Sequence, residues 1–550
     1  MNDLSLLSLR NLSVVDAPGR AVVGNISIDV RPGETMCLVG ESGSGKSVTS
    51  LAVMGLLPRG ALRPAGGEIL LAGENLLAAS ETRLRALRAT SMAMIFQEPM
   101  TALNPIERVG DQIDEVLRAH TSLGKRERRS RMLSMLEEVH LPDVERICRS
   151  FPHEMSGGQR QRIMIAMALI LRPRLLIADE PTTALDVTTQ KQIIALIREL
   201  RENHGTAVLF ITHDMGVVRE IADRVTVMRN GAIVESGSVE DVLATPREEY
   251  TRRLLGAVPS LVPRRPRPEN DAKVLLQVQG LGKRYGIRSM WGASREVVAA
   301  REIEFSLRAG RTLGIVGESG SGKSTVARCA IRLTNPSEGA IHLDGQSVTG
   351  GSPRDLKLLR RRVQMVFQDP YRSLNPRIRV GESIVEGPTN YGVPHAEAMT
   401  EARRLLELVG LPGDAVKRYP HQFSGGQRQR IAIARALAMK PEVLVADEAV
   451  SALDVSVQAQ VLELLRDVQQ RFGLGILFIT HDLRVAAQIC DDIIVMKSGC
   501  IVEQGSATAV LGKPQAEYTR LLFEAAPGRN WDFANCCPLE PESTLSIAAE

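Results

Sequence analysis

The sequence LVGESGSGKSVTS at residues 38–50 decides the fold of this chain, and it returns as IVGESGSGKSTVA at residues 315–327. In each copy an apolar run precedes the loop and a helical pattern follows it. Small residues let successive backbone N–H groups point inward and surround phosphate oxygens at the start of a helix. The stretch therefore predicts a phosphate-binding loop between a buried strand and a helix, and its recurrence predicts two such sites in one chain.

The other sequence motifs also occur twice, in the same order, which indicates an internal duplication. The 33-residue step from Glu180 to His213 is repeated from Glu448 to His481, so the stretch between these residues tolerates no insertion. The repeated segments are FQEPMTALNP from 96 and FQDPYRSLNP from 367, PHEMSGGQRQRIMIAMAL from 152 and PHQFSGGQRQRIAIARAL from 420, LLIADEPTTALDV from 175 and VLVADEAVSALDV from 443, and LFITHDM from 209 and LFITHDL from 477.

Between the copies lies PSLVPRRPRPENDA, residues 259–272, which is rich in proline and charge. This composition predicts a linker rather than a packed element. Fully extended, it would span about 40 Å, enough to let the two halves face each other. We therefore expect a first domain at 1–258, a second domain at 273–525 and a C-terminal tail at 526–550.

Short apolar runs such as LLIAD at 175–179 and AVLFIT at 207–212 are too short for helices and too apolar for strands with one wet face. They predict buried parallel strands. Longer patterns with a period of 3.6 residues, such as TQKQIIALIREL, predict helices that cover a sheet. Since the motifs fall where strands end, each half is predicted to be a doubly wound α/β domain.

Bulk composition narrows the class of protein. The chain has 550 residues, of which 44% are hydrophobic and 3% aromatic, and its net charge of +4 is too weak to indicate a nucleic-acid partner. No apolar run reaches the roughly 18 residues of a membrane span, and MNDLSLLSLR does not resemble a leader, so we expect a cytoplasmic location. Seven scattered cysteines, with only Cys536 and Cys537 adjacent, predict reduced thiols and no iron–sulfur cluster.

The two glycine-rich loops are predicted to hold the phosphates of a nucleotide. Lys46 and Lys323 would reach the terminal phosphates, and the hydroxyls of Ser47 and Ser324 would hold Mg²⁺. The predicted phosphate-binding residues are Gly40, Ser42, Gly43, Ser44, Gly45, Lys46 and Ser47 in the first loop and Gly317, Ser319, Gly320, Ser321, Gly322, Lys323 and Ser324 in the second.

Each copy of LLIADE or VLVADE ends an apolar strand in two carboxylates, which is costly unless a cation or a reacting water uses them. Asp179 and Asp447 fit the metal, directly or through water. Glu180 and Glu448 then fit the base that activates or positions the attacking water, because that carboxylate must not be consumed by the metal.

Two further polar residues follow strands in each copy. His213 and His481 are placed to contact the γ-phosphate; a single histidine at a strand end is usually structural, but the repeated spacing favours a functional role. Gln97 and Gln368 can reach Mg²⁺ or the attacking water, although most glutamines at such places are merely solvated.

The motif SGGQ opens a predicted helix in each half, at residues 156–159 and 424–427. A serine and two glycines at a helix start form an anion site, but this one lacks a lysine or a metal ligand. It therefore needs a partner surface to bind nucleotide. The residues concerned are Ser156, Gly157, Gly158, Gln159, Ser424, Gly425, Gly426 and Gln427.

Taken together, these motifs resemble those of the ABC ATPase family over both halves, from about Leu7 to Leu522. The resemblance implies two P-loop NTPase domains, each a RecA-like core with an antiparallel β subdomain and a helical signature subdomain. It also implies that the halves pair within the chain, so that ATP on Lys46 is closed by Ser424 to Gln427 and ATP on Lys323 by Ser156 to Gln159. Asp186 and Asp454 match the aspartate that communicates across such a pair.

More narrowly, GESGSGKS, FQ(E/D)P and the EYTR(R)LL ends resemble the fused double ATPases of the peptide, nickel and opine uptake subfamily. This resemblance implies an importer ATPase at the cytoplasmic face of the inner membrane, with two permease subunits and a solute-binding protein as partners. Coupling helices of the permease would dock on Glu98 to Pro105 and on Asp369 to Pro376. Dipeptides or oligopeptides lead as the solute, with glutathione, nickel chelates and opines left open.

The sequence departs from the family pattern at three places. The usual leucine of the signature is Met155 or Phe423, and Ala449 stands where the first half has Pro181. In the family an aromatic residue stacks on adenine. Tyr285 fits that role in the second half, whereas the first half offers Val14 or Val15.

Two other classes of protein also contain duplicated ATPases of this kind. A soluble tandem ATPase acting on ribosomes would have a long, helical and charged linker. A DNA-repair ATPase would carry zinc cysteines or a coiled-coil insertion. The short Pro-rich linker favours the importer, and the ribosomal role is the alternative.

Overall fold

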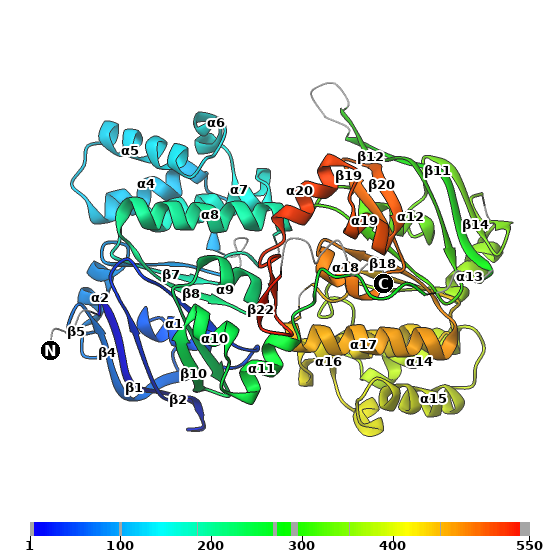
Figure 1. Cartoon of the computed structure of the whole chain (residues 1–550), viewed down its shortest axis with the longest axis horizontal. Helices are drawn as coiled ribbons and strands as arrows, with labels where there is room; N and C mark the ends of the chain where they lie inside the picture. The colour runs from blue at the N-terminus through cyan, green and yellow to red at the C-terminus, as the bar shows by residue number, and fades with distance from the viewer. Residues whose placement is uncertain are drawn as a thin grey trace. The chain divides into compact units, whose positions relative to one another are not determined.

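The computed structural model describes residues 5–97, 102–183, 185–267, 272–287, 295–350, 352–451 and 453–539. The chain forms two compact units. The first comprises Met1–Val258 with Trp531–Pro538, and the second comprises Pro259–Asn530 with Leu539–Glu550. Figure 1 colours the chain from its N-terminus to its C-terminus.

The first unit is built around a six-stranded sheet in which five strands are parallel and the sixth, at one edge, is antiparallel. The buried apolar runs form these strands because both faces of the sheet are covered. The prediction of a doubly wound α/β fold is confirmed. In order across the sheet the strands are β6 (Met92–Ile95), β7 (Leu175–Asp179), β8 (Ala207–Thr212), β3 (Thr35–Val39), β9 (Arg224–Arg229) and β10 (Ala232–Ser238).

A second, antiparallel sheet packs over the helix that follows the glycine-rich loop. Its buried residues and those of the main sheet form one core, which includes Ile26, Ile69 and Val53. In sheet order the strands are β2 (Ala21–Val30), β1 (Leu7–Asp16), β4 (Leu62–Leu71) and β5 (Glu74–Asn75).

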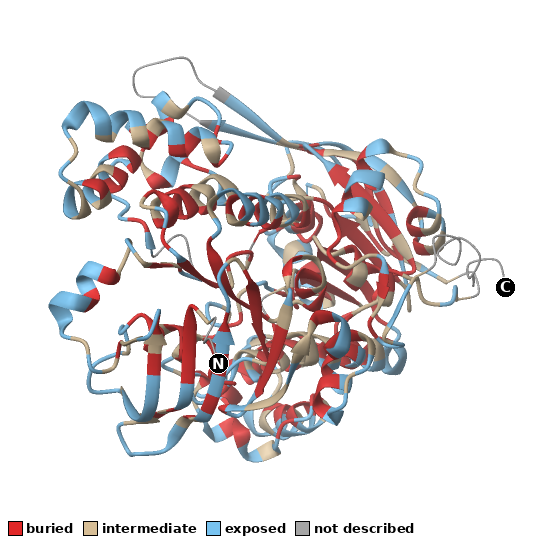
Figure 2. Ribbon diagram, turned by 60° about the vertical axis from the view of Figure 1, so that its left-hand side comes forward, coloured by how far each residue is buried: buried red, intermediate tan, exposed pale blue. Residues whose placement is uncertain are grey.

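The helices of the first unit fall into two groups. Helices α4 to α7 form a separate bundle next to α8, as Figure 1 shows. The remaining helices flank the sheets. Figure 2 colours the ribbon by burial, with buried strands in red and exposed helix faces in pale blue. The helices are α1 (Lys46–Val53), α2 (Glu81–Leu87), α4 (Val109–His120), α5 (Lys125–Glu138), α6 (Val144–Arg149), α7 (Gly157–Leu169), α8 (Val187–His204), α9 (Met215–Ile221), α10 (Val239–Ala244) and α11 (Glu249–Gly256).

The second unit repeats both sheets in the same order. The antiparallel sheet runs β12 (Arg295–Arg308), β11 (Val274–Ile287), β14 (Glu338–Leu343) and β15 (Gln346–Ser347). The main sheet runs β16 (Val363–Val366), β17 (Val443–Asp447), β18 (Gly475–Thr480), β13 (Thr312–Val316), β19 (Asp492–Lys497) and β20 (Cys500–Ser506). The helices are α12 (Lys323–Ala330), α13 (Pro353–Arg362), α14 (Val380–Asn390), α15 (His395–Leu408), α16 (Gly425–Leu437), α17 (Val455–Phe472), α18 (Leu483–Ile489), α19 (Ala507–Gly512) and α20 (Glu517–Ala525).

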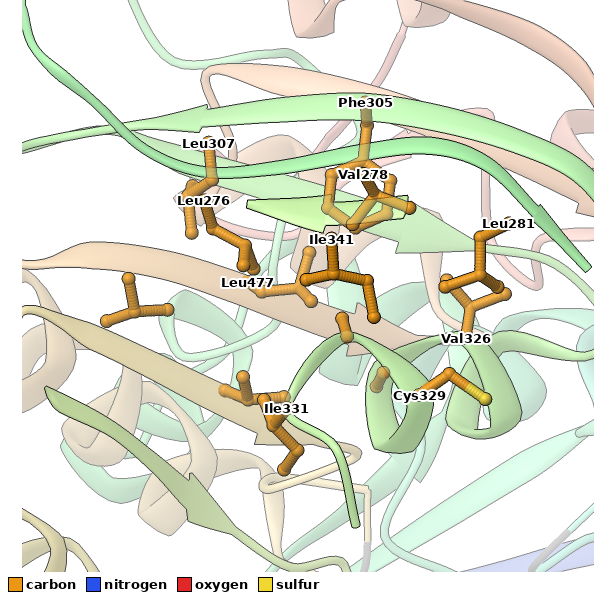
Figure 3. Packing of buried hydrophobic residues seen from close by; sticks show 14 of the residues in the cluster. Leu276, Val278, Leu281, Phe305, Leu307, Val326, Cys329, Ile331, Ile341 and Leu477 are labelled. Carbon is orange, nitrogen blue, oxygen red and sulfur yellow. The ribbon is translucent and has the colours of Figure 1, made fainter. Parts of the chain in front are cut away.

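The core of the second unit lies between its two sheets, around helix α12. Figure 3 shows Val326 and Cys329 of α12 close to Leu281 and Ile341 of the antiparallel sheet, in one cluster of buried residues. This packing fixes the helix that begins at Lys323, and with it the end of the glycine-rich loop.

Residues 259–267 differ from the sequence expectation. They were predicted to be a linker that does not pack, but Leu261 is buried and the side chain of Arg264 forms an ion pair with Asp491, with 2.7 Å between Nη2 and Oδ1. The segment packs because its arginines find a buried carboxylate, a partner that a composition argument cannot see.

Part of the C-terminal tail forms a pair of short strands. Strands β21 (Trp531–Asp532) and β22 (Cys537–Pro538) pair with each other and belong to the first unit. Trp531 is buried, and the guanidinium of Arg219 in α9 lies 4.8 Å from the centre of its ring. Within the described residues, no helix has the length and apolar character needed to cross a bilayer.

Candidate functional site

The ammonium of Lys46 lies inside the first glycine-rich loop. Its Nζ atom donates to the carbonyl oxygens of Gly40 and Glu41 at 2.7 and 2.9 Å, and Lys323 makes the equivalent contacts at 2.8 and 2.7 Å. Gly40 has a φ of +151°, and a Cβ atom there would lie 2.3 Å from the carbonyl oxygen of Met228. Only glycine fits at this position, so the loop keeps its backbone N–H groups close to the helix start, where anions bind.

The serine that follows each lysine faces an aspartate at the end of a neighbouring strand. Ser47 Oγ donates to Asp179 Oδ1 at 3.1 Å, and Ser324 Oγ donates to Asp447 Oδ1 at 2.8 Å. Burial raises the pKa of Asp179 to about 6 and also raises the pKa of Asp447. A hydroxyl and a buried carboxylate form an oxygen donor set that suits Mg²⁺, and a cation would offset the cost of the buried charge.

Glu180 is the centre of the first site. Gln97 Nε2 donates to its Oε2 atom at 2.9 Å, Thr183 Oγ1 donates to the same oxygen at 2.9 Å, and His213 Nδ1 lies 3.2 Å from Oε1. Burial by itself would raise the pKa of Glu180, but the hydrogen bond and charge of His213, aided by Thr183, lower it to about 2. The carboxylate is therefore ionised at neutral pH.

The second site repeats this arrangement around Glu448. Gln368 Nε2 donates to Glu448 Oε2 at 2.8 Å, and His481 Nδ1 lies 3.5 Å from the same oxygen. Burial would lower the pKa of His481, but the neighbouring carboxylate raises it overall. The structure thus brings each predicted glutamine to the glutamate rather than to the serine and aspartate.

The backbone at both glutamates is unusual. Glu180 and Glu448 have φ values of +47° and +48°. Residues other than glycine seldom adopt such values, and those that do cluster at functional sites. Each unit therefore holds its glutamate in a strained conformation at the strand end, a feature that the sequence did not reveal.

The SGGQ motifs begin helices α7 and α16 with an exposed N-terminus. Ser156 accepts a hydrogen bond from the Gln159 backbone at 3.2 Å, and the Gln159 side chain bonds back to the Ser156 N–H at 3.0 Å. Ser424 and Gln427 form the same capping box.

The two glycines of each motif have different surroundings. A Cβ atom on Gly158 would lie 2.6 Å from Thr189, and one on Gly426 would lie 2.2 Å from Val457, so helix packing requires these glycines. A Cβ atom on Gly157 or Gly425 would meet nothing closer than 3.8 Å. Packing within either unit therefore gives no reason for the first glycine, which instead leaves the helix start open to a ligand.

Asp186 and Asp454 are the N-caps of helices α8 and α17. The side chain of Asp186 accepts a hydrogen bond from the Thr189 N–H at 2.9 Å. These aspartates therefore sit at the start of the helix that packs against the signature helix in each unit.

Tyr285 lies on β11 with 42% of its surface exposed, and the Lys283 ammonium is 4.9 Å from the centre of its ring. In the first unit Val14 is buried in the core, while Val15 is half-buried. Val14 is therefore unable to present its side chain to a nucleotide.

Counting along the paired strands from Leu7 and Leu276, the place of Tyr285 is taken in the first unit by Asp16. Its carboxylate forms an ion pair with Arg20, with 2.9 Å between Oδ2 and Nε. The first unit thus has a charged pair where the second has an aromatic ring.

Sequence reasoning missed two residues near these motifs. Thr183 bonds to the catalytic glutamate candidate, and a hydroxyl three residues after it in EPTT was the available signal. Tyr371 lies in the segment that follows Gln368, and the guanidinium of Arg428 stacks 4.0 Å from its ring centre. This contact joins that segment to the signature helix α16, and no sequence pattern indicated it.

Fold and site together define each unit as a P-loop nucleotide hydrolase. The profile of the family described as "ABC transporter" matches residues 23–183 and 300–451, which is more than half of the chain. The chain belongs to this family, as an ATP-binding and ATP-hydrolysing protein with two ATPase domains. A second profile, "Oligopeptide/dipeptide transporter, C-terminal region", matches residues 234–288.

Two transport proteins that match this chain over most of their length support this assignment. The chain is 49% identical to the peptidoglycan transport ATP-binding protein YejF of Agrobacterium fabrum, over 96% of this chain and 97% of that protein. It is 46% identical to the glutathione import ATP-binding protein GsiA of Escherichia coli K12, over 95% and 90%. A solved ATP-binding cassette, MJ0796 with ADP and phosphate, is 27% identical with a TM-score of 0.39, over 42% of this chain and 99% of that one. These relatives do not support the ribosomal alternative.

Proposed function

We propose that this protein energises the uptake of peptides or related solutes by an ABC importer. The observation that carries this proposal is the oligopeptide/dipeptide transporter match at residues 234–288, because those residues lie outside the catalytic motifs. The names of the two relatives point to the same chemistry, since glutathione is a tripeptide and peptidoglycan contains short peptides. Short peptides and compounds that carry them are the proposed solute class.

The proposed partners are two integral membrane permease subunits and, through them, a periplasmic or extracellular solute-binding protein. The protein would lie at the cytoplasmic face of the inner membrane. The permease would dock on the segments that follow Gln97 and Gln368. Of these, residues 98–101 lie outside the described part of the chain, whereas Tyr371 in the second segment is 60% exposed.

The proposed power stroke is a head-to-tail closure of the two halves on ATP. Lys46 would hold the phosphates from one side, and Ser424 to Gln427 would close over them from the other; Lys323 and Ser156 to Gln159 would form the second site. The exposed, capped starts of α7 and α16 support this pairing, since each is an anion site without a cation of its own. Closure would favour the ATP state by direct contacts to the γ-phosphate.

Within each site the chemistry follows from the contacts. Mg²⁺ held by Ser47 and Asp179, or by Ser324 and Asp447, would neutralise phosphate charge. The ionised carboxylate of Glu180 would accept the proton of the attacking water. Its partner His213 would hold that carboxylate in place and face the γ-phosphate.

The decisive experiment is to purify the tagged chain from membranes and identify its partners. We expect two permease subunits to copurify and, after reconstitution in vesicles, ATP-driven uptake of a labelled dipeptide, of glutathione or of a peptidoglycan peptide. Comparing the three solutes in one preparation identifies the preferred class. A chain with Glu180→Gln and Glu448→Gln is the matched control, because it should bind the permease without driving uptake. Recovery with ribosomes and without a permease would overturn the proposal.

A further inference from the structure

Each unit contains an aspartate that ties its switch-histidine helix to its phosphate-binding strand; the side chain of Asp223 is 49% exposed and that of Asp491 is 2% exposed. Asp223 follows α9, and its Oδ2 atom accepts a hydrogen bond from the Thr35 N–H at 2.8 Å. Asp491 follows α18, and its Oδ2 atom accepts from the Thr312 N–H at 2.8 Å. Thr35 and Thr312 begin β3 and β13, the strands that lead into the two loops.

The first unit supplies the cation for its aspartate from its own fold. Arg201 of α8 donates from Nη1 to Asp223 Oδ2 at 2.8 Å and to Thr35 Oγ1 at 2.9 Å. Arg201 is 22 residues before Asp223. The ion pair is therefore part of the ATPase fold in that half.

The second unit has no arginine at the equivalent position. The residue 22 positions before Asp491 is Gln469, whose Nε2 atom donates to Thr312 Oγ1 at 2.8 Å. Glutamine replaces the hydrogen bond to the threonine but carries no charge. The side chain of Asp491 is only 2% exposed, and a buried carboxylate without a cation is strongly destabilising.

The cation comes instead from the segment between the two domains. Arg264 Nη2 lies 2.7 Å from Asp491 Oδ1, and Arg267 Nη1 donates to Gln469 Oε1 at 3.0 Å. The backbone N–H of Arg264 also donates to the carbonyl oxygen of Ala487 at 3.1 Å, near the end of α18. Arg264 thus supplies the charge, and Gln469 the hydrogen bond to the threonine, that Arg201 alone supplies in the first unit.

Other contacts along the same segment hold it against α18. Gln488 Nε2 donates to the carbonyl oxygen of Ser260 at 3.1 Å, and Leu261 is 5% exposed. Arg267 Nη1 also donates to the carbonyl oxygen of Gly310 at 2.9 Å, just before β13 begins. The segment thus spans from the helix behind His481 to the strand that leads to Lys323.

We propose that residues 259–267 are a structural part of the second ATPase unit, in which Arg264 replaces the arginine that the first unit carries at position 201. Arg264 is a positioning residue: it joins the end of α18, which follows His481, to the start of β13. The segment therefore completes the fold of the second half and does more than connect it to the first. This inference does not depend on the proposed solute or partners.

The test exchanges the source of the cation in the full-length chain. Arg264→Ala should lower the midpoint of thermal unfolding by about 5 °C or more, because it removes the nearer of the two guanidinium groups beside the buried Asp491 and leaves only Arg267, whose Nε atom is 3.8 Å from Oδ1. Adding Gln469→Arg should recover most of that loss, since it restores the arrangement of the first unit. Arg265→Ala is the matched control, one position along the same segment, and should change the midpoint by less than about 2 °C.

A local measurement separates positioning from general destabilisation. In Arg264→Ala, amide hydrogen exchange should accelerate at Thr312 and along α18, while Thr35 and α9 keep their protection. If Arg264→Ala does not yield folded protein, the exchange measurement is made on Arg264→Lys. This variant keeps the positive charge but loses the geometry of the guanidinium, so amide exchange should accelerate at Thr312 and along α18. Unchanged exchange at Thr312 and α18, or equal effects of the changes at 264 and 265, would overturn the proposal.

Discussion

The two ATPase units agree closely at their reaction centres and differ in what surrounds them. Both have a strained glutamate bonded to a glutamine and a histidine, and both pair a loop serine with a buried aspartate. The cation behind the switch-histidine helix, by contrast, comes from α8 in the first unit and from residues 259–267 in the second. The groups placed to act on phosphate are the same in both halves, and the supports that hold them are not.

Three more differences lie around the sites. Tyr285 stands where the first unit has Asp16, and Tyr371, which stacks on Arg428 of the signature helix, stands where the sequence of the first half has Met100. In the second unit the guanidinium of Arg328 lies 3.9 Å from the carboxylate of Asp447, whereas the same position of the first loop helix is Leu51. An arginine beside the predicted metal ligand is therefore present in the second unit and not at the equivalent position of the first.

The strongest test of the likeness between the units removes the glutamates. With both Glu180→Gln and Glu448→Gln, ATP turnover should fall by about 100-fold or more, since the general base is lost while the shape of the site is kept. Because both glutamates are bonded to a glutamine and a histidine, each single change should lower turnover to the same extent. Steady-state phosphate release measures all three variants, with wild-type as the reference. Full turnover in one single variant and none in the other would show that only one site is catalytic.

The signature glycines provide a matched pair within one helix. Gly157→Ala adds a methyl group where the unit has room, so stability should be unchanged, while ATP turnover should fall about tenfold if that surface closes on nucleotide. Gly158→Ala forces a methyl group against Thr189 and should lower the free energy of unfolding by about 1–3 kcal/mol. Thermal unfolding and phosphate release separate the two effects. Normal turnover in Gly157→Ala would contradict the proposed closure.

The pKa of Asp179 predicts a pH dependence at the first metal site. Its folded value of about 6 lies above the ordinary value of 3.8, so the folded state binds the proton more tightly. The stabilising effect of this protonation is complete below about pH 4 and is lost as the pH rises through 6, at a cost of about 3 kcal/mol without metal. Mg²⁺ affinity should rise over the same range, because the metal competes with the proton.

Asp179→Asn provides the control for this pH effect. It should raise stability at pH 7 in the absence of Mg²⁺ and remove the pH-dependent part of metal binding at the first site. Thermal unfolding from pH 4 to 8, with and without Mg²⁺, measures both. A variant with the same pH profile as wild-type would show that another group titrates.

The smallest expected effect concerns adenine. Tyr285→Ala should weaken ATP binding at the second site by about fivefold, since a base–aromatic stack contributes on the order of 1 kcal/mol. Asp16→Ala is the equivalent change in the first unit and should leave the affinity within about twofold, because no ring is lost. A fluorescent ATP analogue titrated against each variant measures the two sites. Equal losses in both variants would exclude stacking as the difference between the units.

Much of the molecule followed from the sequence. The strand-forming runs, the order of the motifs and the duplication predicted two doubly wound domains, because buried parallel strands and covering helices have distinct periods. The same reasoning reached Lys46, Asp179, Glu180 and His213, since motifs at strand ends meet at one edge of a sheet. In the structure Ser47 lies within hydrogen-bond distance of Asp179, and Gln97 and His213 lie within hydrogen-bond distance of Glu180.

Other features depended on long-range contacts. Composition predicted an unpacked segment at residues 259–272, yet Arg264 finds a partner more than two hundred residues away. The tail likewise gave no sign that Trp531 would pack on Arg219 of the first unit.

The sequence by itself determined the class of protein, the two phosphate loops and the identity of the groups placed beside them. Those features depend on residues close together in the chain, or on the geometry that all doubly wound α/β folds share. Only the tertiary structure decided which arginine neutralises which buried carboxylate, and that the glutamates are held at positive φ. Such features depend on the desolvation of individual charges and on local backbone strain, which arise only once distant segments are packed together.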